Sequence, residues 1–527
     1  MHRSRSTLPL IFACTCALLS VCLQGLHGQG SPSKPNIVFI ITDDQSWDSL
    51  GFMGGQVHTP RIDQMAAEGL FLSDFNVTST VCSPSRYSFL TGRFAGRCEG
   101  EHFMKEHPYG DQTQVENIGE LELDQWNLPK VLQANGYVTG FVGKSHLIRH
   151  DWMGPRATAM ERAGMDADPR DLEVNARMRR NHEKWCEEMK KYGFDFVDGF
   201  YGANLRELWN EELNVHNLDW TVDKAFDFFE KYKDEPFFLY FSTTLHHGPL
   251  PWNNKYSLNA DPRMTGEGFV EEGFDVLPPR EDVLRRNREA GFKDRDAYAL
   301  WLDDGVGAII DKIDELGLSE DTLIIFVPDH GSYRHGKATL HEYGMRVPML
   351  LLWKGTIEPG LEYDGIVANI DLAPTLMDLA GIEKPADYKI DGLSFKSVLF
   401  GDQQPIRQVL FGELGHSRAI KSKEWKYIAI RYPPELQKRI DSGEEFKGFD
   451  GEPIPLPYLT RNGHLGHHAS RANPNYFDAD QLYNLVDDPE ETNNIFQQNP
   501  EVAEMAKRAL SRELARFEDR PFGEFTN

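Results

Sequence analysis

The chain has 527 residues, enough for one large domain with insertions or for two domains. Its acidic residues outnumber its basic ones by 82 to 56, and the formal net charge is −26. Such an acidic surface excludes nucleic-acid binding by bulk electrostatic attraction. An anionic substrate is not excluded, because a pocket is governed by its own few charges and by any bound metal.

The first thirty residues have the pattern of a secretory signal peptide. Two arginines precede an apolar run over residues 8–23, and small residues follow it. This run is too short and wrongly flanked for a spanning helix, although a retained N-terminal anchor is an alternative, and no later stretch is long enough to cross a bilayer. Cys22 also suggests lipoprotein processing, but Val21 is large for the residue before a lipidated cysteine. We therefore predict a signal peptide at residues 1–30 and export to the periplasm or the extracellular space.

Beyond that segment only three cysteines remain: Cys82, Cys98 and Cys186. Three thiols do not make a disulfide framework. If Cys82 is chemically modified, Cys98 and Cys186 either form one bridge or stay free, and the sequence favours neither.

From residue 34 the chain alternates apolar runs of strand length with segments of helical period. This alternation predicts an α/β fold with a large, mostly parallel sheet flanked by helices. The predicted strands at residues 36–42, 137–142, 237–242 and 322–327 each end in polar groups. Those groups are, in chain order, Asp43-Asp44, Lys144-Ser145-His146, His246-His247 and Asp329-His330. Because ligands bind at the carboxyl ends of strands in such folds, we expect these side chains to meet.

Three segments fit the repeat poorly, near residues 101–125, 151–222 and 250–295. We interpret them as insertions at the functional rim of the sheet, with simple surface padding as the alternative.

The composition turns polar near residues 401–405, which predicts a domain boundary. We expect a catalytic domain over residues 31–402 and a smaller α+β domain over residues 403–527. The smaller domain should contain a strand pair, at residues 408–412 and 425–430, and a C-terminal helix. A histidine-rich segment at residues 463–468 lies in a loop-rich context, so we expect no second metal site there.

Three carboxylates at the strand ends, Asp43, Asp44 and Asp329, are hard oxygen donors. Such donors suit Ca²⁺ or Mg²⁺ better than zinc. An isolated Asp-Asp pair is more often a turn or a helix cap, but the convergence of two strand ends favours a metal site. His330 is then either a ligand of the metal or a residue that contacts the ligands.

The stretch from Cys82 to Gly92 combines a thiol, a proline, hydroxyls and a guanidinium at the start of an apolar, helix-like run. A turn leading into a helix aims its first residues at an anion. The order Cys-x-Pro-Ser-Arg followed by Leu-Thr-Gly resembles the signature of type I sulfatases, a family of the alkaline phosphatase-like superfamily. In that family the cysteine is oxidised by a formylglycine-generating enzyme to Cα-formylglycine, also called 3-oxoalanine.

The resemblance extends over most of the chain. Gly143-Lys144-Ser145-His146 is similar to the family's Gly-Lys-Trp-His signature, with serine in place of tryptophan. His247-Gly248-Pro249 is similar to Pro-His-x-Pro, and Gly336-Lys337 with Arg346-Val347-Pro348 to Gly-Lys…Arg-Val-Pro. The resemblance implies one divalent cation per chain, calcium in preference to magnesium. Its implied ligands are Asp43, Asp44, Asp329, His330 and the modified Cys82, although asparagine is commoner at the position of His330.

The resemblance also implies a reaction at residue 82. A formylglycine there hydrates to a geminal diol, and the cation lowers the pKa of one hydroxyl so that it attacks sulfur. Asp329 is the implied base. The implied cationic groups are Arg86 and Lys144, which hold the diol, and Lys337, which neutralises sulfate oxygens together with the metal.

Two histidines have implied proton-transfer roles. His247 protonates the leaving alcohol. His146 takes a proton from the second hydroxyl, so that the sulfated intermediate collapses to aldehyde and sulfate.

We therefore predict an exported sulfatase whose partners are a sulfated saccharide, or another sulfate ester, and the formylglycine-generating enzyme. A phosphonate or phosphate monoester hydrolase of the same superfamily is one alternative. A degenerate sulfated-glycan-binding protein is another, and the complete set of reactive residues argues against it. The sequence indicates neither the sugar nor the oligomeric state.

Overall fold

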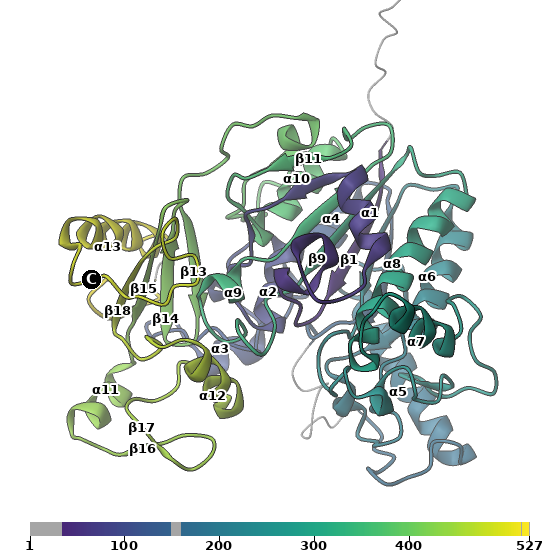
Figure 1. Cartoon of the computed structure of the whole chain (residues 1–527), viewed down its shortest axis with the longest axis horizontal. Helices are drawn as coiled ribbons and strands as arrows, with labels where there is room; N and C mark the ends of the chain where they lie inside the picture. The colour runs from purple at the N-terminus through teal and green to yellow at the C-terminus, as the bar shows by residue number, and fades with distance from the viewer. Residues whose placement is uncertain (1–33, 149–159, 518, 526–527) are drawn as a thin grey trace, which may run out of the picture. The chain divides into compact units, whose positions relative to one another are not determined.

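The computed structural model describes residues 34–148, 160–517 and 519–525, so the predicted signal peptide lies outside the described residues. A large mixed sheet lies at the centre of this part of the chain (Figure 1). Its strand order is β11-β2-β10-β9-β1-β6-β4-β5. The strands are β1 (Asn36–Thr42), β2 (Leu70–Leu72), β4 (Val138–Lys144), β5 (Phe196–Tyr201), β6 (Phe237–Ser242), β9 (Thr322–Pro328), β10 (Met349–Leu352) and β11 (Leu361–Tyr363).

Most neighbouring strands in this sheet are parallel. Only β10 runs antiparallel to its neighbours, β9 and β2, among the described strands of the sheet. Ile41 of β1 is level with Val327 of β9 and with Ser242 of β6, so these strands end at the same edge. The predicted α/β fold with a mostly parallel sheet is confirmed.

Helices cover both faces of the sheet, which is why β1 is apolar throughout and buried at every residue. Ile37, Phe39 and Ile41 point into one core, where the Phe39 and Phe89 ring centroids are 5.3 Å apart. Val38 and Ile40 point into the other core. The covering helices are α1 (Pro60–Glu68), α2 (Cys82–Thr91), α4 (Leu128–Ala134), α6 (Leu218–Tyr232), α8 (Ala297–Glu315) and α10 (Leu372–Leu379).

The three segments that fit the repeat poorly contain regular structure of their own, and the second half of residues 151–191 forms the helix that its sequence predicts. Strand β5, within residues 151–222, extends the central sheet beside β4. The other elements of these segments are α3 (Glu101–Glu106), α5 (Leu172–Lys190), α7 (Arg280–Glu289) and the hairpin of β7 (Met264–Thr265) and β8 (Gly268–Phe269). Among the described residues no helix is long and apolar enough to cross a membrane.

The C-terminal region is built on a separate antiparallel sheet with the order β13-β14-β15-β18. Its strands are β13 (Leu410–Leu414), β14 (Ser417–Lys421), β15 (Trp425–Ile430) and β18 (Asp480–Asn484), and its helices are α11 (Pro434–Asp441), α12 (Gly463–Ala472) and α13 (Pro500–Leu514). The predicted strands at residues 408–412 and 425–430 are present as β13 and β15, but they do not pair with each other, because β14 lies between them. The histidine-rich segment forms α12 rather than a loop.

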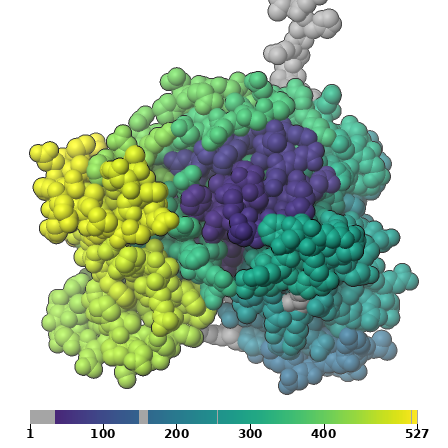
Figure 2. Space-filling model, viewed as in Figure 1, coloured from purple at the N-terminus to yellow at the C-terminus, as the bar shows by residue number. Residues whose placement is uncertain are grey.

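Residues 35–527 form one compact unit, and the space-filling view shows its C-terminal region, in yellow, directly against the rest (Figure 2). A buried set of charges ties the two regions together, and we call it the C-terminal ion network: Glu342, Lys421, Lys426 and Glu491. Lys421 Nζ lies 2.9 Å from a Glu342 oxygen and 2.6 Å from Asp74, while Lys426 Nζ lies 2.6 Å from Glu342 and 3.0 Å from Glu491. A domain boundary near residue 402 stays a prediction.

Candidate active site

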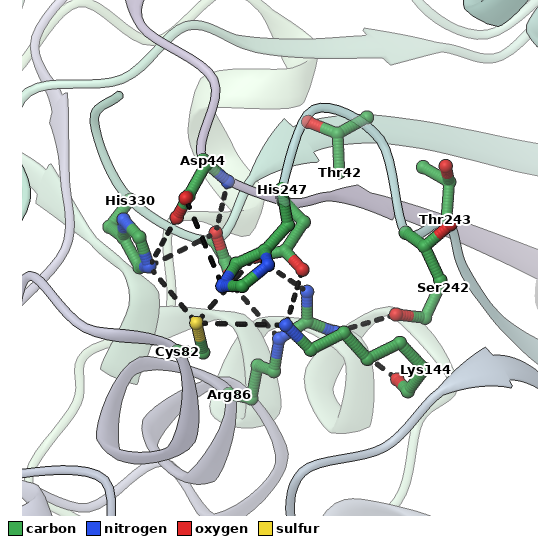
Figure 3. Close-up of polar contacts among 12 residues, drawn as sticks. Thr42, Asp44, Cys82, Arg86, Lys144, Ser242, Thr243, His247 and His330 are labelled. Carbon is green, nitrogen blue, oxygen red and sulfur yellow. Dashed lines mark hydrogen bonds and ion pairs between the residues drawn. The ribbon is translucent and has the colours of Figure 1, made fainter. Parts of the chain in front are cut away.

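The predicted reactive side chains gather at one edge of the central sheet, as Figure 3 shows for several of them. Asp43 and Asp44 follow β1, Lys144 ends β4, and Asp329 and His330 follow β9. Cys82 and Arg86 lie in the first two turns of α2, which begins at this edge. Parallel strands of equal register thus bring together residues that are distant in the sequence.

Cys82 is fully buried at the first residue of α2. Its Sγ lies 3.5 Å from Lys337 Nζ, 3.7 Å from Lys144 Nζ and 3.4 Å from His330 Nε2. Burial alone would raise the pKa of the thiol, but the two ammonium groups hold it well below its usual value. Because a helix N-terminus also favours negative charge, this position stabilises an anionic group.

Helix α2 holds Cys82 in a fixed place. Its N-terminal flank, Val81, is extended, and Pro84 lies in the first turn. The missing N–H of a proline costs no hydrogen bond there, because the N–H groups of the first turn have no partner within the helix. Gly92 ends the helix in the left-handed region with φ 64°, and its N–H donates to the Ser88 carbonyl. Ser85 Oγ donates to the Asp329 carbonyl at 2.5 Å, which fixes the helix against the end of β9.

Arg86 joins the ends of three strands. Its Nε donates to Asp329 Oδ2 at 2.9 Å, and its Nη1 donates to Ser242 Oγ at 2.5 Å and to the Lys144 carbonyl at 3.2 Å. Its Nη2 lies 3.7 Å from Asp43 Oδ1 and has no hydrogen-bond partner among the described residues. This fully buried guanidinium therefore keeps one nitrogen without a hydrogen bond beside Asp43.

The carboxylates are held by backbone and lysine contacts. Asp44 has a left-handed φ of 56°, and its N–H donates to Asp329 Oδ1 at 3.1 Å. Lys337 Nζ lies 2.6 Å from Asp44 Oδ1, and Lys144 forms an ion pair with Asp43. Burial would raise the pKa of Asp43, but Lys144 holds it below its usual value.

The pKa values of Asp329 and His330 show the electrostatic field at this site. Burial raises the pKa of Asp329 to about 7, although His330 acts to lower it. Burial would lower the pKa of His330, yet Asp329 raises it to about 9. The carboxylates therefore stabilise positive charge at this point.

The donor set fits a hard divalent cation. One ligand atom each from Asp43, Asp44, Cys82 and His330 lies within 4.8 Å of the others. Asp329, also predicted as a ligand, lies outside this group, but its Oδ1 is 3.5 Å from His330 Nε2. Two of these four donors, and Asp329 beside them, are carboxylates, the hard ligands that Ca²⁺ and Mg²⁺ prefer.

The two predicted proton-transfer histidines lie in different environments. His146 is buried with a φ of 58°, burial lowers its pKa, and its Nδ1 has no hydrogen-bond partner in the part of the chain that the structure describes. His247 is partly exposed on the open side, where its Nε2 lies 4.0 Å from Asp44 Oδ2. His246 packs instead against Tyr298, with ring centroids 4.7 Å apart.

Sequence reasoning missed three residues that support the site. Asn204 Oδ1 accepts from Lys144 Nζ at 2.9 Å, and Ser242 binds Arg86 as described above. His216, fully buried, bridges Thr244 Oγ1 at 2.8 Å and the Pro249 carbonyl at 2.9 Å, so it fixes both sides of the loop that carries His247. Asn204 and Ser242 end or follow strands, which is a signal that could have found them. His216 gives no such signal.

Outside the buried centre lies a cleft of about 250 Å³. Asp44 connects it to the reactive groups, and its lining includes Asp48, Trp252, Tyr298 and Arg334. A larger cavity, lined by residues such as Arg93, Trp126 and Arg516, contains none of the predicted site residues. We place the candidate active site at the smaller cleft, because only there do a cavity and the reactive side chains meet among the described cavities.

Cys98 and Cys186 are free, buried thiols and form no disulfide in the described chain. Burial raises the pKa of both, so neither has the electrostatic environment of Cys82.

Known sulfatases are similar to this chain. The family model described as Sulfatase matches residues 35–382, and one described as N-sulphoglucosamine sulphohydrolase, C-terminal, matches residues 329–439. N-acetylgalactosamine-6-sulfatase of Mus musculus is 28% identical over 430 residues, covering 76% of this chain and 73% of the mouse protein. Arylsulfatase A of Bos taurus is 27% identical over 524 residues, covering 94% and 90%.

Among solved structures, a putative sulfatase from Bacteroides fragilis matches with a TM-score of 0.61 and 22% identity, over 95% of this chain and 100% of that chain. This similarity shows the fold. The sulfatase model spans well over half of the sequence. The chain therefore belongs to the sulfatase family and is a sulfuric ester hydrolase.

Proposed function

We propose that this protein is an exported, formylglycine-dependent sulfatase that hydrolyses sulfate esters of a sulfated carbohydrate with the help of one Ca²⁺. The observation that carries the proposal is the environment of Cys82, a buried thiol between two lysines at a helix N-terminus. Two buried nitrogen atoms, Arg86 Nη2 and His146 Nδ1, lack partners among the residues described here. They are suited to oxygen atoms that cysteine itself does not carry.

The residues around Cys82 divide into those that hold charge and those that move protons. A formylglycine at residue 82 would supply the hydrated aldehyde as nucleophile, and a cation held by Asp43, Asp44, Asp329 and His330 would activate it. Arg86 and Lys144 orient the group at residue 82, and Lys337 neutralises the sulfate. His247, on the open side, donates a proton to the leaving oxygen, while His146 accepts one from the buried side.

A carbohydrate substrate is supported by the relatives, because the mouse protein is named for the 6-sulfate of N-acetylgalactosamine. We therefore choose the 6-sulfated chondroitin disaccharide as the saccharide probe and 4-nitrophenyl sulfate as the generic one. Export rests on the N-terminal sequence pattern.

The test compares kcat/KM on 4-nitrophenyl sulfate and 4-nitrophenyl phosphate after co-expression with a formylglycine-generating enzyme. We expect the sulfate to be hydrolysed faster. Faster phosphate turnover would favour the phosphate monoester hydrolase, and turnover of neither ester would favour a binding protein.

The cation is tested separately by calorimetry on chelator-treated protein. We expect one Ca²⁺ to bind per chain, with stabilisation of the fold by about 2.7 kcal/mol at a concentration 100 times the Kd. An Asp44→Ala variant should lose this binding. Unchanged binding in that variant would contradict the proposed ligands.

A further inference from the structure

The cleft outside the buried centre contains a cation that the reaction does not use. Arg334 lines this cleft together with Asp44. Its exposed side chain forms no ion pair with any residue that the structure describes. In a chain with a net charge of −26, an unpaired arginine in the mouth of the active site is a distinctive feature.

Arg334 is oriented by Trp252, which lines the same cleft. The guanidinium carbon lies 4.7 Å from the centre of the indole ring. A guanidinium that stacks on an indole face keeps its in-plane N–H groups free to bind a carboxylate or sulfate through two hydrogen bonds. The pair therefore presents an ordered, unused anion-binding edge to the cleft.

The loop that carries Arg334 is fixed between two groups of the catalytic centre, His330 and Lys337. The Ser332 carbonyl accepts from the N–H groups of Gly336 at 2.9 Å and of Lys337 at 3.0 Å, and the Ser332 N–H donates to Ser46 Oγ at 2.9 Å.

Neighbouring aromatic rings support the same loop. The ring of Tyr333 lies 4.8 Å from that of His468 and stacks on His464 at 5.9 Å. Trp252 follows His247 by five residues in the sequence. Arg334 thus lies close in the chain to Lys337, and Trp252 lies close to His247, the residue proposed to protonate the leaving oxygen.

The remaining charges of the cleft leave Arg334 as its available cation. Arg295 lies 3.6 Å from Asp296. Asp44 is paired with Lys337, and Asp48 is a carboxylate suited to accept from sugar hydroxyl groups. An anionic group on the sugar would give Arg334 a charge-assisted hydrogen bond that a neutral sugar does not offer.

We infer that Arg334, stacked on Trp252, binds a second anionic group of the saccharide, so that the substrate carries a carboxylate or sulfate besides the sulfate ester that is cleaved. This inference rests on the proposed function and specifies its substrate class. The binding is electrostatic and involves no covalent step.

The test uses Arg334→Ala and Arg334→Lys, with Arg508→Ala as the matched control. Arg508 is an exposed arginine of α13 and does not line the cleft. The substrates are 4-nitrophenyl sulfate, the 6-sulfated chondroitin disaccharide, its carboxyl-reduced form and the 4,6-disulfated disaccharide. We expect Arg334→Ala to lower kcat/KM at least about tenfold on a substrate with a second anionic group and less than about twofold on 4-nitrophenyl sulfate. Arg334→Lys should keep part of the activity, and Arg508→Ala all of it.

The saccharides distinguish the two sources of the anion. A loss on the 6-sulfated disaccharide but not on its carboxyl-reduced form assigns the uronate, and a loss on the disulfated one alone assigns a second sulfate. Equal effects on all substrates, or hydrolysis of 4-nitrophenyl sulfate without hydrolysis of any disaccharide, would overturn the inference.

If 4-nitrophenyl sulfate itself is not hydrolysed, the proposed function fails instead. Calorimetric binding of the same disaccharides to wild type and Arg334→Ala then decides the inference, with unchanged affinity counting against it.

Discussion

Two buried clusters of carboxylates and lysines lie in this protein, and they differ in whether a reactive side chain lies among the charges. In the C-terminal ion network, Lys421 and Lys426 each pair with two carboxylates. In the catalytic centre, Lys144 Nζ and Lys337 Nζ lie 3.7 Å and 3.5 Å from the Cys82 thiol. Buried polar atoms without a hydrogen bond occur in both clusters, among them Lys426 Nζ and Glu491 Oε1 in the network and Arg86 Nη2 and His146 Nδ1 in the centre.

The difference separates a structural role from a chemical one. The network fixes β14 and β15 against α9 (Glu342–Met345), and it contains no reactive side chain. The catalytic cluster surrounds a thiol whose pKa the two lysines lower. Mutations in the first should therefore change stability, and mutations in the second should change activity.

The largest expected effect is that of Cys82→Ala. Removing the reacting residue should lower the rate of sulfate ester hydrolysis by about 10⁴-fold or more, because the remaining groups have no nucleophile to assist. Steady-state hydrolysis of 4-nitrophenyl sulfate measures it, with circular dichroism as the check on folding. Undiminished activity would refute the assigned role of this residue.

Lys426→Met should lower stability rather than activity. Removing one ammonium leaves buried carboxylates without compensation, which costs about 3–5 kcal/mol of unfolding free energy. Urea denaturation measures the loss, while kcat of the folded fraction should stay within about threefold of wild type. As a control, Lys438→Met breaks an exposed pair with Glu435 and should cost less than about 1 kcal/mol. Equal losses of unfolding free energy in the two variants would show that the buried network stabilises the fold no more than an exposed ion pair does.

His247→Asn sharpens the comparison within the catalytic centre. A general acid matters for a poor leaving group and little for a good one, so hydrolysis of the sulfated disaccharide should slow about 100-fold. Hydrolysis of 4-nitrophenyl sulfate, whose leaving group needs no proton, should slow far less. The ratio of the two rate losses is the measurement, and a ratio near one would assign His247 to another role.

The smallest expected effect is a pH dependence of stability from Glu491. Burial raises the pKa of Glu491 to about 7, while Lys426 acts to lower it. Because the folded state then holds a proton that the unfolded state releases, the contribution of this group to stability falls as pH rises from its unfolded pKa toward 7. Urea denaturation at several pH values should show a flatter profile for Glu491→Gln than for wild type. An identical slope in both proteins would argue against this titration.

The catalytic edge of the sheet was predictable because its signals are local. Residues 36–42 are apolar on both faces and end in Asp43-Asp44, and the other predicted strands end in a similar way. Parallel strands share an edge, so the sequence predicts that these polar groups meet. The motif that begins at Cys82 added the chemistry.

Other elements depend on contacts that are distant in the sequence. Strand β5 contains Asp198 and Gly199, which interrupt its apolar pattern, so Asn204 beyond it was not found. Strand β14 is buried although it contains Arg418 and Lys421, whose partners include the Thr113 carbonyl and Asp74. Such partners cannot be inferred from a local pattern.

The central claim is that Cys82 becomes the reacting group through oxidation to formylglycine. The most direct test is mass spectrometry of the peptide that contains Cys82. The samples are co-expressed with different amounts of formylglycine-generating enzyme. The account predicts the mass of an aldehyde in place of the thiol, in a fraction that rises in proportion to the specific activity of each sample. Full activity in protein whose Cys82 is entirely unmodified would contradict it.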